Sequence, residues 1–212
     1  MKHDGLDVEI KEKVEHLKAA LEKENIEVHE FSFPYLDHLV PTYYVLSTAE
    51  ASSNLSRFDG VHYGFRSDAS KGVEETYKNS RSDGFGEEVK RRIMTGTFVL
   101  SHGYYDAYYT KAQKVRRLAR EATNDIFEKV DILLTPTTAS TAFELGSISD
   151  PLQLYLQDIF TVHANITGHP AISIPFGKHS NGMPFGLQLM SACNEEEKLI
   201  YYSEAINKYF TQ

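Results

Sequence analysis

The sequence has little cysteine and no long apolar segment. Its single cysteine, Cys193, excludes an internal disulfide and fits a reducing compartment. No apolar run approaches the roughly 18 residues that a membrane-spanning helix needs. The N-terminus, MKHDGLDVEIKEK, is charged and does not resemble a secretory signal. We therefore expect a cytoplasmic protein without membrane contact.

Basic charge is also scarce. The chain has 212 residues, with 22 Lys and Arg against 30 Asp and Glu, and a formal net charge of −8. Binding to nucleic acid needs clustered cations that contact phosphates. The two basic runs, Lys90–Arg92 and Lys114–Arg117, are typical of solvated helix faces. A stand-alone nucleic-acid-binding role is therefore not expected.

The signatures of several enzyme classes are missing. The sequence has no glycine-rich phosphate loop, no G-x-S-x-G, no H-E-x-x-H and no C-x-x-C, and its nine histidines are scattered. The neighbours Ser101 and His102 indicate little, because a catalytic pair is recognised by geometry. Cys193 precedes a predicted helix, but a lone cysteine there is more typical of a structural thiol. We assign no catalytic residue and no metal site.

Hydrophobic periodicity predicts alternating helices and strands. Helices are predicted over residues 7–24, 42–54 with Pro41 in the first turn, 85–100, 104–129, 152–161 and 195–209. Strands are predicted over residues 26–30, 131–134, 171–176 and 185–190, and Asn181-Gly182 indicates a hairpin turn between the last two. These elements predict an α/β fold with a mixed β-sheet covered by helices.

A loop and a group of tyrosines lie outside these elements or at the start of one. Residues Leu55–Ser70 contain several Gly and Asp residues, which predict an ordered loop. An aromatic stripe at helical spacing, formed by Tyr104, Tyr105, Tyr108 and Tyr109, is expected to pack against the core.

Four segments carry a resemblance to a known family. They are AEASSNLSRFDGVHYGFR at 49–66, GFGEEVKRRI and the following residues at 84–109, DILLTPT at 131–137, and NITGHPAISIP at 165–175 with PFGLQ at 184–188. The last two resemble the C-terminal half of the amidase-signature family. The first two resemble the A subunits of the tRNA-dependent amidotransferases within it. The resemblance covers the chain from about Gly5, with departures at Val162-His163 and at His169, where the family commonly has Leu.

This resemblance implies a reaction and an assembly. The family hydrolyses glutamine with a Ser–cis-Ser–Lys triad, whose Gly/Ser-rich segment lies in the N-terminal half and has no counterpart here. Residues 1–212 are therefore expected to be the C-terminal part of an amidase-signature domain, inactive alone. Ammonia would pass to a partner protein that activates Glu-tRNA(Gln) or Asp-tRNA(Asn) with ATP and Mg²⁺. The implied partners are the amidotransferase B and C subunits, with charged tRNA bound mainly through the former, and no cofactor in this chain.

Three residues match positions that hold free glutamine in this family: Tyr43, Arg92 and Asp158. Free glutamine differs from a simple amide by its α-carboxylate and α-ammonium groups. A guanidinium can bind the carboxylate in two-pronged fashion, a carboxylate can accept from the ammonium, and a phenol adds a neutral hydrogen bond. Arg91 points about 100° away from Arg92 on a helix and is not expected to share this role.

Two other interpretations stay open at the level of sequence. The chain could be a fragment of a general amidase with an apolar substrate, because such enzymes share the last two segments. It could also be a non-catalytic module that docks a partner or senses an amino acid.

Overall fold

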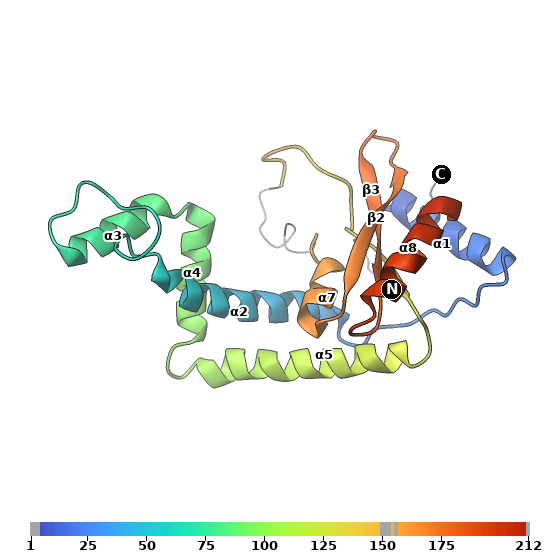
Figure 1. The fold of residues 1–212 in the computed structure, drawn as a ribbon, viewed down its shortest axis with the longest axis horizontal. Helices are drawn as coiled ribbons and strands as arrows, with labels where there is room; N and C mark the ends of the chain where they lie inside the picture. The colour runs from blue at the N-terminus through green and yellow to red at the C-terminus, as the bar shows by residue number, and fades with distance from the viewer. Residues whose placement is uncertain (1–4, 149–153, 155–156, 211–212) are drawn as a thin grey trace. The chain divides into compact units, whose positions relative to one another are not determined.

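The computed structural model describes residues 5–148, 154 and 157–210. The chain divides into two compact units, one of Met1–Val40 with Val115–Gln212 and a second of Pro41–Lys114. The first unit contains α1 (Val8–Lys23), β1 (Leu133–Pro136), α7 (Thr161–Thr167), β2 (Ala171–Lys178), β3 (Pro184–Met190) and α8 (Glu196–Phe210) (Figure 1). The second contains η1 (Leu55–Arg57), α3 (Val73–Gly84), α4 (Glu87–Val99) and η2 (Tyr105–Thr110). Two helices contribute residues to both units, α2 (Leu36–Asn54) and α5 (Lys111–Phe127).

The sheet of the first unit has three strands in the order β1-β3-β2, and both pairings are antiparallel. Residues 179–183 connect β2 to β3 in a hairpin. Asn181 accepts a hydrogen bond from the backbone N–H of Met183 at 2.9 Å through its Oδ1. Gly182 adopts a φ of 86°, a left-handed conformation that glycine takes without a steric penalty. The predicted turn is therefore confirmed.

One face of this sheet forms the hydrophobic core. Side chains alternate along β3, so that Leu187 and Leu189 point to the same face and are fully buried. Helices α1 and α8 cover this face through Leu17 and Leu199 (Figure 1). Burying one such leucine stabilises the fold by about 2 kcal/mol. Helix α1 begins at a side-chain cap, because Oδ1 of Asp7 accepts from the N–H groups of Glu9 and Ile10 at 2.9 and 3.2 Å.

In the second unit, α2 and α4 touch through a glycine. A Cβ atom placed on Gly96 would lie only 1.9 Å from the carbonyl oxygen of Thr48. One turn further along α2, the hydroxyl of Ser52 forms a hydrogen bond at 2.9 Å with that of Thr97 on α4. Only glycine at position 96 allows the two helix backbones to approach so closely.

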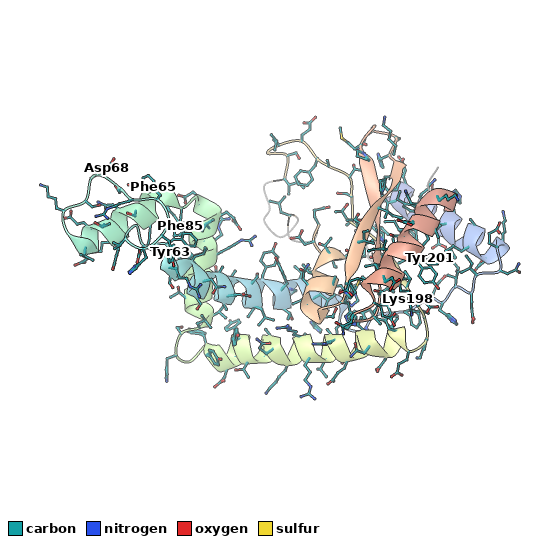
Figure 2. All side chains as sticks on the ribbon, viewed as in Figure 1. Tyr63, Phe65, Asp68, Phe85, Lys198 and Tyr201 are labelled. Atoms are coloured by element: carbon teal, nitrogen blue, oxygen red, sulfur yellow. The ribbon has the colours of Figure 1, made fainter. Side chains whose placement is uncertain are left out.

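The loop that follows α2 is ordered by polar contacts. Oδ1 of Asp59 accepts from the backbone N–H groups of Val61 and His62, each at 2.8 Å. The start of the loop is tied to α3, because Nη1 of Arg81 donates to the carbonyl oxygen of Leu55 at 2.8 Å. The loop still presents aromatic side chains such as Tyr63, which is 63% exposed (Figure 2). The prediction of an ordered loop is confirmed.

The α/β class is confirmed, as are most predicted elements. The helices over 7–24, 85–100 and 195–209 and three of the four predicted strands are present within a few residues of their predicted bounds. Of the helix predicted over 152–161, residues 152, 153, 155 and 156 lie outside the described part of the chain. Of the other residues, Leu154 is helical, 157–160 form a turn, and Thr161 begins α7.

Several details were wrong. The sheet is antiparallel among the described residues, not mixed, because β3 pairs in that sense on both sides. Residues 26–30 form no strand; Glu30 instead pairs with Lys18 of α1. Pro41 lies inside α2 rather than in its first turn, because the helix already begins at Leu36. Helix α3 was not predicted, since its sequence, VEETYKNSRSDG, is strongly polar.

The aromatic stripe also differs from its prediction. Tyr104, Tyr105 and Tyr108 are each exposed by 44–45%, so they do not pack into a core. They contact nearby aromatic rings instead: the ring centroid of Tyr104 lies 4.2 Å from that of Phe98 on α4, and those of Tyr105 and Tyr109 are 5.0 Å apart. The segment Tyr105–Thr110 is a π-helical turn rather than the start of a continuous α-helix.

Among the described residues, no helix has both the length and the apolar composition of a membrane-spanning segment.

Candidate functional site

Arg92 is held on α4 by a carboxylate and an aromatic ring. Its Nε donates to Oε1 of Glu88 at 3.0 Å, one helical turn earlier. Its guanidinium carbon lies 5.6 Å from the ring centroid of Tyr44 on α2, within cation–π range. The side chain keeps 36% of its surface exposed. The hydrogen bond to Glu88 raises the pKa of Arg92, and the phenols of Tyr44 and Tyr43 add to the increase.

Tyr43 lies beside this arrangement. Its ring meets that of Tyr44 edge-on, with centroids 5.3 Å apart and planes at 84°. Both side chains are half-buried. Tyr43 and Arg92, two of the three residues predicted from the sequence, therefore belong to one unit and share Tyr44 as a neighbour.

Arg91 has a different environment from Arg92. It is 60% exposed and pairs through Nη1 with Oε2, the second carboxylate oxygen of Glu88. Glu88 is thus shared between two arginines, one turned to solvent and one turned to Tyr44. This difference follows from the helical rotation between successive residues.

Asp158, the third predicted residue, lies in the first unit. It is half-buried in the turn of residues 157–160, not in the middle of a helix. Its carbonyl oxygen accepts from the backbone N–H of Val162 at 2.9 Å and from the hydroxyl of Thr161 at 3.1 Å. The residue therefore lies just before α7, and that helix fixes its backbone.

Buried polar contacts anchor the segment around Asp158. Nε2 of Gln188, on the polar face of β3, donates to the carbonyl oxygen of Phe160 at 3.0 Å. On α7, Nε2 of His163 lies 2.8 Å from the hydroxyl of Thr123 on α5. That hydroxyl already donates to Ala119, so the imidazole must carry its proton on Nε2.

His163 is almost fully buried, and its pKa is lowered to about 4, mainly by this burial and also by the nearby His169. His169 is tied to the same two helices through the Thr167 hydroxyl at 2.9 Å and Asn124 at 3.0 Å. Its pKa is lowered by burial and by Arg120. The two histidines that depart from the family pattern therefore belong to one hydrogen-bonded cluster beside α5 and α7.

Sequence reasoning missed Glu88 and Tyr44. Glu88 carried a signal, because an acid four residues before an arginine on a helix predicts an ion pair. The contact of Tyr44 with Arg92 depends on how α2 and α4 cross, which no local pattern reveals. Within the described part of the chain, no three His, Cys, Asp or Glu side chains are grouped so as to hold a metal ion.

The chain belongs to the amidase family, whose sequence pattern matches residues 1–200. Its relatives include the glutamyl-tRNA(Gln) amidotransferase A subunit of Lachnospira eligens, 50% identical over 198 residues that cover 93% of this chain and 41% of that protein. The protein of the same name from Halothermothrix orenii is 51% identical and covers 91% of this chain and 40% of that protein. The chain thus spans about two fifths of the length of these relatives.

Solved structures agree with this family. The crystal structure of the glutamyl-tRNA(Gln) amidotransferase A subunit from Thermotoga maritima superposes with a TM-score of 0.71 at 40% identity, over 98% of this chain and 40% of that one. A crystal structure of an amidase gives a TM-score of 0.74 at 22% identity, over 97% of this chain and 43% of that one. The amidase-signature fold predicted from the sequence is therefore confirmed.

Proposed function

We propose that residues 1–212 form the C-terminal part of the A subunit of a glutamyl-tRNA(Gln) amidotransferase and supply its glutamine-recognition surface. Arg92 binds the α-carboxylate, Asp158 accepts from the α-ammonium, and Tyr43 adds a neutral hydrogen bond. The observation that carries this proposal is the guanidinium of Arg92, which is held by Glu88 and Tyr44 yet remains partly exposed. Such a group suits a planar, two-pronged bond to a carboxylate.

The chemistry of the reaction belongs elsewhere in this proposal. The Ser–cis-Ser–Lys triad lies in a part of the protein that this chain does not contain, so the chain alone is inactive. The B and C subunits complete the assembly, and the B subunit binds the charged tRNA, ATP and Mg²⁺. We expect this assembly to be in the cytoplasm. The similarity to amidotransferase A subunits over nearly the whole of this chain supports this division.

The experiment compares Arg92→Ala with Arg91→Ala in the enzyme assembled from the complete A subunit and its partners. Arg91 is the matched control because it has the same charge, shares Glu88 and faces solvent. Loss of a charge-assisted carboxylate contact should lower glutamine-dependent kcat/KM by about 10- to 100-fold. Activity with ammonia, which has no carboxylate, should fall far less.

Three results would contradict the proposal. An equal loss with glutamine and ammonia in Arg92→Ala would make Arg92 a structural residue. Hydrolysis of short apolar amides in preference to glutamine would instead favour a general amidase. Glutamine hydrolysis above background by the purified 212-residue chain would refute the assignment of the triad to another part of the protein.

A further inference from the structure

Arg92 is positioned by two neighbours that bind its guanidinium in different ways. Glu88 accepts from Nε at 3.0 Å, and the ring of Tyr44 lies 5.6 Å from the guanidinium carbon. Among the described residues, no hydrogen bond is made by its two terminal nitrogens. One edge of the guanidinium is therefore occupied, the Tyr44 ring lies within cation–π range of it, and the edge suited to a two-pronged carboxylate contact remains.

An arginine side chain needs such restraint to act as a selective donor. It has several rotatable bonds, and a planar fork binds a carboxylate well only when its plane and edge are fixed. A contact at Nε fixes the edge, and a contact with an aromatic face fixes the plane. Neither contact alone does both.

The surrounding backbone makes this restraint rigid. Tyr44 and Arg92 lie one helical turn before Thr48 and Gly96, where the backbones of α2 and α4 are in close contact. Because the helices touch there and again at Ser52, Tyr44 is held at a constant distance from α4. The ring position is thus fixed by two helices rather than by a loop.

We propose that Glu88 and Tyr44 are positioning residues that orient Arg92 for the α-carboxylate of glutamine. This inference rests on the proposed function of Arg92. Glu88 is also negatively charged and could weaken carboxylate binding by repulsion. Orientation outweighs repulsion here, because Glu88 is 47% exposed and charge effects at that exposure are screened by water and salt.

The first test compares Glu88→Leu with Glu87→Leu as its control. Leucine has no oxygen that could accept from Nε of Arg92, whereas glutamine would keep one. Both glutamates lie in the first turn of α4 and favour the helix dipole, but Glu87 pairs only with Lys90 among the described residues, at 3.5 Å. In the assembled enzyme, Glu88→Leu should raise the KM for glutamine about fivefold with kcat nearly constant, the size expected for one oriented charged contact. Glu87→Leu should match the wild type. An unchanged or lowered KM in Glu88→Leu would overturn the proposal.

The second test addresses the aromatic face. Tyr44→Leu removes the face and should raise the KM for glutamine, whereas Tyr44→Phe retains the face and should keep the KM near that of the wild type. A double variant of Glu88→Leu with Arg92→Ala should show no added loss over Arg92→Ala alone, because Glu88 acts through Arg92. Additive losses, or equal losses in Tyr44→Leu and Tyr44→Phe, would contradict a positioning role.

A third measurement separates this inference from the proposed function. The Nε–H signal of Arg92, observed by NMR in the 212-residue chain, should exchange slowly in the wild type and rapidly in Glu88→Leu, which has no oxygen to accept from it. Equal exchange in both would overturn the positioning role by itself. Slow exchange in the wild type, combined with no discrimination between glutamine and γ-aminobutyramide by the assembled enzyme, would instead refute the proposed function. That amide is glutamine without its α-carboxylate.

Discussion

Replacing Gly96 with alanine tests the contact that brings Tyr44 to Arg92. The new Cβ would lie 1.9 Å from the carbonyl oxygen of Thr48 and 2.7 Å from Cβ of Ser52, whereas ordinary contacts begin at 3.4 Å. The nearest atoms belong to the backbone and cannot rotate away. The two helices must therefore separate by about 1.5 Å, the difference between 3.4 and 1.9 Å, or bend.

The magnitude follows from two opposing terms. Overpacking of this kind destabilises a fold by about 1–3 kcal/mol. The higher helix propensity of alanine relative to glycine stabilises α4 by up to about 1 kcal/mol and offsets part of this loss. The net loss should be about 1–2 kcal/mol, and each kcal/mol lowers the Tm of a chain of this size by about 2–4 °C.

The assay is thermal unfolding of the 212-residue chain, followed by circular dichroism, with Gly86→Ala as the control. Gly86 precedes the same helix, has a φ of −68°, and has no atom within 4 Å of an added Cβ. In the assembled enzyme, Gly96→Ala should also raise the KM for glutamine, because the displaced ring of Tyr44 no longer orients Arg92. A Tm equal to that of Gly86→Ala would refute the close approach of α2 and α4.

Two further predictions concern the first unit. Asp7→Ala should cost about 1 kcal/mol in urea unfolding by removing the cap of α1, whereas Asp7→Asn keeps an accepting oxygen and most of the stability. His163 has a folded pKa of about 4 against an unfolded value near 6.5, so the unfolded state binds more protons between these values. Stability should be complete above about pH 6.5 and fall by up to about 3 kcal/mol as the pH drops to about 4. His163→Gln should reduce this slope, leaving the smaller contribution of His169, whereas His16→Gln, at an exposed position on α1, should leave it unchanged. Equal slopes in the two variants would contradict the assignment to His163.

The predictable parts of the fold are those with local signals. Alternating apolar residues identified β2 and β3, Asn181-Gly182 identified their turn, and the apolar spacing on α1 and α8 identified the helices that cover the core. The wrong predictions also arose from local sequence patterns. Residues 26–30 alternate like a strand but have no strand partner among the described residues, and α3 has few apolar residues because little of it is buried.

The candidate site was predictable only in part. Tyr43, Arg92 and Asp158 came from a resemblance in sequence, and nothing in their own spacing assigns them a common task. From composition alone, Arg92 would be predicted to be a charged residue on a helix surface. The partial exposure of its side chain agrees with that prediction. What distinguishes it from Arg91 is the ring of Tyr44 from another helix, a contact that depends on the tertiary structure.

Charge balance around Arg92 gives a physical reason for the sharing of Glu88. Arg91 and Arg92 contribute two positive charges, and the single carboxylate of Glu88 contacts both. The three side chains therefore carry one net positive charge. In the proposed function, the α-carboxylate of glutamine would neutralise this charge, whereas a simple amide would leave it uncompensated. The preference for glutamine over γ-aminobutyramide measures whether this charge balance contributes to selectivity.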